Sequence, residues 1–284
     1  MVLKNKPLGF KLSTAWLTLC VLMATLGWLL PLPSWQSSDS DALGVPMFSK
    51  GHILGTDNWG VDQLSAMING TRISLGVAVV SVTLGALIGA FLGVMAGYTR
   101  GWIDAIISMY FNVTLAFPTL VLLLALVAIF ASPDPFNPGT TLPRMVVLTF
   151  AITFILIPFL GRLARAATVS WAGRDFVLVA KSLGLKRRTI LAQHIIPNVL
   201  PSLISVSFLA AGLIIILEGG LSILGAGGDP GSSWGSLLAR NRGDLALTPH
   251  TTFIPVAAIA LTTMAFNYFG EYLRTSIDNR DSRI

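Results

Sequence analysis

Residues that could perform acid–base, nucleophilic or metal chemistry are few and scattered in this sequence. The three histidines, His52, His194 and His250, stand apart, with neither an H-E-x-x-H pair nor a spacing typical of zinc ligands. The sequence also lacks the G-x-x-x-x-G-K-[S/T] loop that binds nucleotide phosphates, so we expect no ATP hydrolysis by this chain itself. The single cysteine, Cys20, cannot form an intramolecular disulfide. These observations predict no catalytic residue, no metal and no cofactor in the chain.

The composition is typical of a membrane protein. Of the 284 residues, 54% are hydrophobic and 11% are charged, with a net charge of +6. This excludes a disordered chain and argues against a soluble enzyme, because too little polar surface remains to face water. The 19 basic residues are too sparse for a nucleic-acid-binding face, since only Lys186, Arg187 and Arg188 form a basic block. We therefore expect a multi-pass membrane protein without a nucleic-acid partner.

Six apolar runs are long enough to cross a membrane as helices, which takes about 20 residues for about 30 Å of hydrocarbon. They cover residues 15–32, 73–98, 103–130, 145–167, 203–217 (or on to 224) and 252–273. Their continuous apolar character favours helices over the alternating strands of a barrel. The first run is read as a retained anchor rather than a signal peptide, because no A-x-A cleavage pattern follows it.

The charges of the connecting segments set the orientation. With a cytoplasmic N-terminus, 14 of the 19 basic residues lie inside, which gives a net charge of +9 inside and −3 outside. We therefore predict a protein of the cell (plasma or inner) membrane with both termini in the cytoplasm. Its predicted parts are a cytoplasmic N-terminus (1–14), a first transmembrane helix (15–32), an extracytoplasmic segment (33–72), a five-helix core (73–273) with an inner loop at 168–201 and an outer loop at 219–250, and a cytoplasmic C-terminus (274–284).

The inner loop 168–201 is predicted to form two short helices with a break between them. Ser170 or Asp175 could cap the first helix, and Gly184 stands where a helix ends in a left-handed residue. Pro197 and Pro201 are expected to end the second. Each helix has an apolar stripe at helical spacing. The stripes are Phe176, Val179, Ala180 and Leu183 in the first helix, and Ile190, Leu191, His194 and Ile195 in the second. Such a pair could lie on the lipid surface or dock into a soluble partner.

The second run carries glycines four residues apart, at Gly85, Gly89, Gly93 and Gly97. Three overlapping G-x-x-x-G steps on one face let another helix approach closely, which is how helices associate in lipid. This face could pack within the chain or against a partner subunit.

Four segments together resemble the permeases of ABC importers, specifically the dipeptide, oligopeptide and nickel branch. They are residues 174–201, with nine residues between Gly184 and H-I-I-P-N; residues 52–74, with H-I-L-G-T-D and R-I-S; residues 218–235, with E-G-G-L-S-I-L-G and S-W-G; and residues 265–280, with A-F-N-Y-F-G-E-Y-L-R. Their order and spacing hold over most of the chain. The six spans and the G-T-D motif point to the C-type permease subunit of such systems.

The resemblance implies an all-α membrane protein with the six-helix fold of type I ABC importer permeases and a cytoplasmic coupling-helix loop. It implies a heterodimer with a homologous permease, two ATPase subunits that hold ATP and Mg, an extracytoplasmic substrate-binding protein, and a peptide substrate. Glu218 and Asn267 are candidates for a translocation path or outer gate, although Glu218 could instead be an interface or rim residue. The residues implied for coupling to the ATPases are Phe176, Val179, Ala180, Lys181, Leu183, Gly184, Lys186, Arg187, Arg188 and Pro197.

The loop departs from the family at Leu178 and Val179, which stand where the family has glutamate and alanine. This puts in doubt a specific salt bridge to the ATPase, and the charged contacts could come instead from Lys181 or from the basic block at 186–188. Nickel or another small solute is an alternative substrate. An ion-coupled secondary transporter is a further alternative, against which the scarcity of carboxylates within the spans counts.

Overall fold

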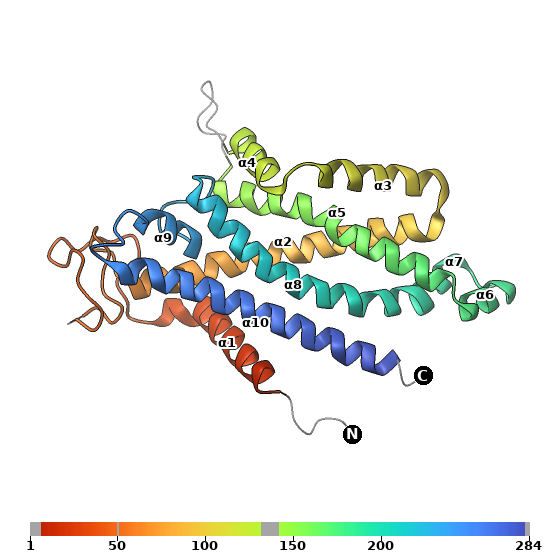
Figure 1. Ribbon diagram of the computed structural model, residues 1–284, viewed down its shortest axis with the longest axis horizontal. Coiled ribbons are helices and arrows are strands. Elements are labelled where there is room, and N and C mark those ends of the chain that lie inside the picture. The colour runs from red at the N-terminus through yellow and green to blue at the C-terminus, as the bar shows by residue number, and fades with distance from the viewer. Residues whose placement is uncertain (1–6, 50, 132–141, 282–284) are drawn as a thin grey trace. The chain divides into compact units, whose positions relative to one another are not determined.

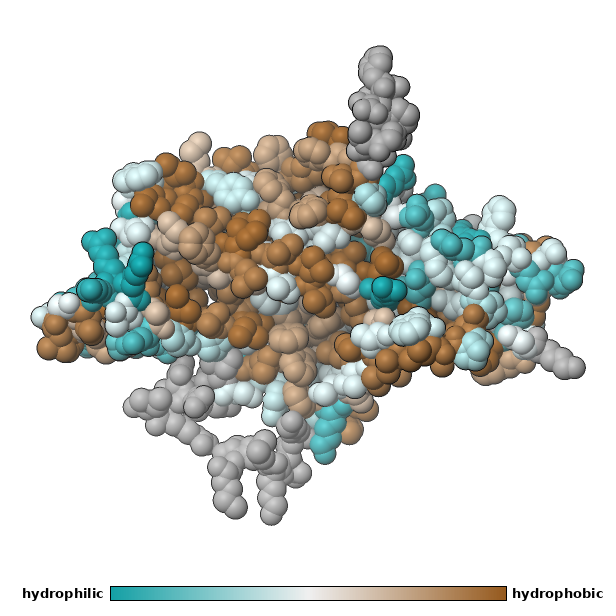
Figure 2. Space-filling view, turned by 180° about the vertical axis from the view of Figure 1, so that it is seen from behind, coloured by the Kyte–Doolittle hydropathy of each residue, from teal (hydrophilic) through white to brown (hydrophobic). Residues whose placement is uncertain are grey.

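The computed structural model describes residues 7–49, 51–131 and 142–281, and helices make up most of this part of the chain (Figure 1). Parts of the predicted termini, 1–14 and 274–284, lie outside the described residues. Within these residues, five helical stretches are long and apolar enough to cross a membrane, and each overlaps a predicted run. They are Leu8–Leu29, Gln63–Thr99, Arg144–Ala172, Arg187–Ile223 and Pro249–Ser276. Figure 2 shows hydrophobic residues over much of the face that it displays, as expected for a surface in contact with lipid.

The prediction of one helix over 103–130 is wrong. The run forms two helices, α3 (Gly101–Ala116) and α4 (Thr119–Phe130), whose axes differ by 93°. The break falls at Phe117, which adopts an extended conformation with φ −77° and ψ 138°. Phe117 precedes Pro118, and the proline ring disfavours the helical conformation for the residue before it. Counted as one broken span, the pair brings the total to six.

The prediction that Pro197 and Pro201 end the second short helix of the inner loop is also wrong. Helix α7 (Arg187–Ile190), the π-helical turn η3 (Leu191–Ile195) and α8 (Ile196–Ile223) follow one another without a break. Pro197 lies in the first turn of α8 and Pro201 lies inside it. The wider turn at η3 is the kind of local adjustment by which a helix accommodates proline.

The chain divides into two compact units. Unit 1 takes residues up to 79, 124–149 and 211–269, and unit 2 takes 80–123, 150–210 and the residues from 270 onward. Helices α2 (Gln63–Thr99), α5 (Arg144–Ala172), α8 and α10 (Pro249–Asp281) each contribute residues to both units.

In unit 1, α1 (Leu8–Leu26) packs along α10. The rings of Phe10 and Phe269 stack with centroids 5.2 Å apart, and the indole N–H of Trp16 donates to Thr262 Oγ1 at 2.9 Å. Helix α1 continues into the short 3-10 helix η1 (Gly27–Leu29), where Gly27 lies against Ile68 of α2. Helix α2 begins at Gln63, ahead of the apolar run at 73, because its polar first turns are themselves buried in unit 1.

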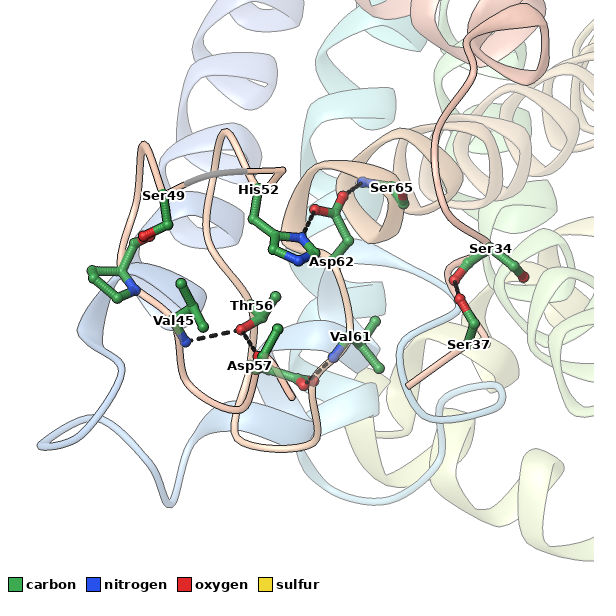
Figure 3. A network of polar contacts seen from close by, with 12 residues as sticks. Ser34, Ser37, Val45, Ser49, His52, Thr56, Asp57, Val61, Asp62 and Ser65 are labelled. Carbon is green, nitrogen blue, oxygen red and sulfur yellow. Dashed lines mark hydrogen bonds and ion pairs between the residues drawn. The ribbon is translucent and has the colours of Figure 1, made fainter. Parts of the chain in front are cut away.

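The segment that leads into α2 is held by a network of side-chain hydrogen bonds (Figure 3). Asp62 caps α2, since its Oδ1 accepts the N–H of Ser65 at 2.8 Å, and its Oδ2 lies 2.9 Å from His52 Nδ1. Asp57 accepts the N–H groups of Trp59 and Val61. Its other carboxylate oxygen forms an ion pair at 3.2 Å with the half-buried Arg240, which lies on α9 (Trp234–Asn241). The G-T-D motif thus fastens this loop to α9.

In unit 2, the glycine face of α2 packs against α5 of the same chain. Gly89 lies against Ile157 and Gly161, while Gly93 lies against Gly161 and Ala164. A Cβ at any of the four predicted glycines, Gly85, Gly89, Gly93 or Gly97, would come within 3.0 Å of an atom of α5. The close-packing face therefore meets a helix within the subunit, which is one of the two alternatives that the sequence leaves open.

Candidate functional site: an exposed docking helix

Helix α6 (Asp175–Ser182) has one face buried in unit 2 and another that no described residue covers. Val177 and Ala180 are buried and join a core that includes Leu160, Ile190 and Val199. On the exposed side, Phe176, Val179 and Leu183 have exposed fractions of 42%, 57% and 77%. Thus Ala180 of the predicted stripe points into the subunit, whereas the other three members of that stripe face outward as a short apolar ridge.

Both ends of α6 are defined by local backbone geometry. Gly184 has φ +75°, as the sequence predicts for a left-handed residue after the helix. The N–H of Leu185 donates to Ala180 O at 3.2 Å and that of Gly184 donates to Lys181 O at 3.0 Å, which together form a Schellman motif. The predicted side-chain cap is wrong, because the N-cap is Arg174 and Asp175 is already the first helical residue. Asp175 instead favours the helix through its charge at the positive N-terminus.

Aromatic side chains pack against Phe176, the first residue of the exposed ridge. The ring centroid of Phe176 lies 6.2 Å from that of Trp171 and 6.1 Å from that of His194. The guanidinium of Arg174 lies 5.1 Å from the centroid of Trp171. Phe176 is thereby held on one side while its other side remains exposed, as in a preformed contact surface.

Positive charge gathers beside the ridge. Lys181, Lys186, Arg187 and Arg188 are all exposed. Arg187 and Arg188 begin the continuous helix that runs to Ile223, where the positive end of the helix dipole disfavours cations by about 0.3–1 kcal/mol each. An acidic surface placed against them would offset that cost. Pro197, the remaining residue predicted for coupling, is exposed in the first turn of α8 and does not belong to the ridge.

Glu218 lies elsewhere, in unit 1, and is completely buried. One carboxylate oxygen accepts hydrogen bonds from Ser222 Oγ at 2.9 Å and Ser233 Oγ at 2.6 Å, and the other accepts from Ser74 Oγ at 3.2 Å. The backbone of Gly235 also hydrogen-bonds to the carboxylate. Since Ser233 caps α9, this single carboxyl group joins α8, α9 and α2.

Asn267, the other candidate for a translocation path, is exposed on α10. It lies beside Gly212 of α8, whereas Gly219 of α8 lies beside Ile259. Asn267 and Glu218 are therefore at different levels of the α8–α10 pair, and the structure does not bring them together.

Truncation of Glu218 should destabilise the packing of α9. In Glu218→Ala three buried serine hydroxyls lose their acceptor, which costs about 2–3 kcal/mol and should lower the Tm of the purified protein in detergent by about 5–10 °C. Glu218→Gln keeps acceptor capacity and should lose less. Glu271→Ala, which removes an exposed carboxylate on α10, is the matched control. Equal Tm values for Glu218→Ala and Glu271→Ala would contradict this role.

Sequence reasoning missed two polar contacts of unit 2. Arg165 on α5 forms a two-point ion pair with Asp104 on α3, with nitrogen–oxygen distances of 2.5 and 2.7 Å. Arg162 donates to Asn112 Oδ1 at 3.0 Å. These partners are separated by 61 and 50 residues, so no local pattern signals them.

Comparison with known proteins agrees with this architecture. The glutathione transport system permease protein GsiD of Pectobacterium atrosepticum is 36% identical over 93% of this chain and 85% of its own length. The dipeptide transport system permease protein DppC of Alkalihalophilus pseudofirmus is 34% identical over 92% of this chain and 83% of its own length. A structure of the MetNI methionine ABC transporter shares the fold, with a TM-score of 0.59 at 16% identity over 75% of this chain and 97% of that one.

Residues 85–282 also match the model of a family described as the binding-protein-dependent transport system inner membrane component. The matched region contains α6, the glycine face and Glu218. The family model and the full-length relatives agree with each other and with the helical fold. The chain therefore belongs to this family and is a membrane-embedded permease subunit of an ABC importer.

Proposed function

We propose that the chain imports short peptides as one of two permease subunits that enclose a translocation path. The observation that carries this proposal is the similarity, along nearly the whole chain, to permeases named for glutathione and dipeptide transport. Glutathione is itself a short peptide, so both names indicate the same substrate class. An extracytoplasmic binding protein would deliver the peptide, and a homologous permease would complete the path.

Energy would come from two ATPase subunits that bind ATP and Mg, because the chain has no phosphate-binding loop of its own. The proposed orientation, with both termini in the cytoplasm, puts α6 on the side where ATP is available. There the apolar ridge of Phe176, Val179 and Leu183 would insert into a groove of one ATPase. Closure of the ATPases around ATP would then move the permeases between inward-open and outward-open states.

Uptake assays in a strain that lacks the chain test this proposal. Return of the gene should restore uptake of a labelled dipeptide or of glutathione, and ATP depletion should abolish that uptake while collapse of the ion gradients alone should not. Restored uptake of nickel but of neither peptide would overturn the substrate assignment. Uptake that follows the ion gradient, with no ATPase co-purifying in mild detergent, would overturn the proposed energy source.

A further inference from the structure

Helices α2 and α8 leave an apolar groove between them in unit 2, with a cavity of about 340 Å³. Bulky side chains form most of its lining, among them Phe91, Met95 and Tyr98 of α2 and Leu200 and Leu203 of α8. Phe91 and Leu200 are 64% and 42% exposed, so the groove opens to the surface of the chain. An apolar cavity of this size that stayed empty would forfeit the dispersion contacts of its walls.

The shape of the lining favours a flexible chain over another helix as the occupant. Helices associate in lipid through small residues that let backbones approach, or through polar side chains that bond across the interface. The four glycines of α2, Gly85, Gly89, Gly93 and Gly97, are already turned toward α5, and Ala90 and Thr99 are the small α2 residues that line the groove. The groove instead presents phenylalanine, methionine and leucine side chains, which leave room for a hydrocarbon tail and offer no close backbone contact.

One end of the groove carries positive charge. The Nζ atom of Lys181 lies 5.8 Å from the ring centroid of Tyr98, which lines the groove. Arg187 lies four residues, or about one helical turn, before the lining residue Leu191 and is therefore on the same face of the helix. Within the described chain neither cation has an ion-pair partner. An aromatic ring with cations beside an apolar groove is the pattern by which membrane proteins hold anionic headgroups.

We propose that this groove binds one anionic phospholipid, with an acyl chain between α2 and α8 and its phosphate at Lys181. Lys181 belongs to α6, so the bound lipid would fasten the proposed docking helix to the transmembrane helices. The inference depends on the membrane location of the chain, and it uses the proposed orientation only to place the lipid in the cytoplasmic leaflet.

Native mass spectrometry of the purified importer complex, after exchange into vesicles of phosphatidylcholine with or without phosphatidylglycerol, tests the site. We expect one retained phosphatidylglycerol per chain. Lys181→Gln and Leu200→Trp should each reduce this retention at least fivefold, the first by removal of the cation and the second by obstruction of the groove. Lys186→Gln, on the same loop but outside the groove, is the matched control.

Two outcomes would overturn the proposal without bearing on peptide uptake. If neither variant changes the retention of phosphatidylglycerol, the lipid binds elsewhere. If phosphatidylcholine is retained equally well, the site does not select lipids by their headgroup charge. A photoreactive residue at position 200 gives an independent readout: cross-links to lipid support the proposal. Cross-links to the partner permease alone would show that the groove is a protein interface and would overturn it.

Discussion

An aspartate in place of Val179 or Leu183 should abolish uptake while the chain stays folded in the membrane. Both side chains are more than half exposed, so the substitutions should leave the packing of unit 2 intact. Once the ridge is docked, however, the new carboxylate would be buried without a partner, which costs several kcal/mol. Because 1.4 kcal/mol corresponds to a factor of ten in affinity, we expect association with the ATPases to weaken more than 100-fold.

Co-purification of ATPase with the tagged permease measures this effect, together with peptide uptake and the amount of permease in the membrane. Gln193→Asp adds the same charge at an exposed position on the same loop but outside α6, and it should behave as wild type. Val177→Asp, whose site is fully buried, should instead lower the amount of folded chain. Normal uptake by Val179→Asp and Leu183→Asp would show that this ridge does not couple the permease to its energy source.

Local sequence patterns predicted the end of α6 but not its side-chain cap. The sequence predicts a left-handed conformation at Gly184, because glycine adopts that conformation at less cost than any other residue. The φ of +75° confirms this prediction. Proline was harder to interpret. Pro118 breaks its run, whereas Pro197 and Pro201 are accommodated within a continuous helix, because a π-helical turn precedes them. The residue type alone does not distinguish these outcomes.

Contacts between distant segments could not be predicted in the same way. The sequence marks Glu218 as a candidate for a translocation path or for a rim residue. Its role as a hydrogen-bond acceptor depends on Ser74, 144 residues away, and on Ser233, which caps a separate helix. The pairing of Asp104 with Arg165 likewise arises only when α3 and α5 come together. The glycine spacing predicted a close-packing face and left its partner open, since the spacing describes one helix and the partner is set by the fold.

That partner can be tested through Gly93, where substitution should have the largest effect on folding. A Cβ there would lie 2.8 Å from Ala164 Cβ and 2.9 Å from Arg165 N, and it would also meet the carbonyl oxygen of Gly161. Two of these three atoms belong to the backbone of α5, so no side-chain rotation relieves the overlap. A shift of α5 would also disturb a second contact, because Phe111 of α3 packs directly on Gly161.

We therefore expect Gly93→Ala to destabilise the chain by about 1–3 kcal/mol and Gly93→Leu to prevent its recovery as a folded protein. Tm and monodispersity in detergent measure both effects. The matched control lies on the same helix, since a Cβ at Gly76 would meet nothing within 4 Å and Gly76→Ala should be neutral or slightly stabilising. The contradicting outcome is a Gly93→Ala chain that is as stable as Gly76→Ala in isolation but fails to assemble with the second permease. The glycine face would then be needed for packing against the partner subunit, and its contact with α5 would not stabilise the fold.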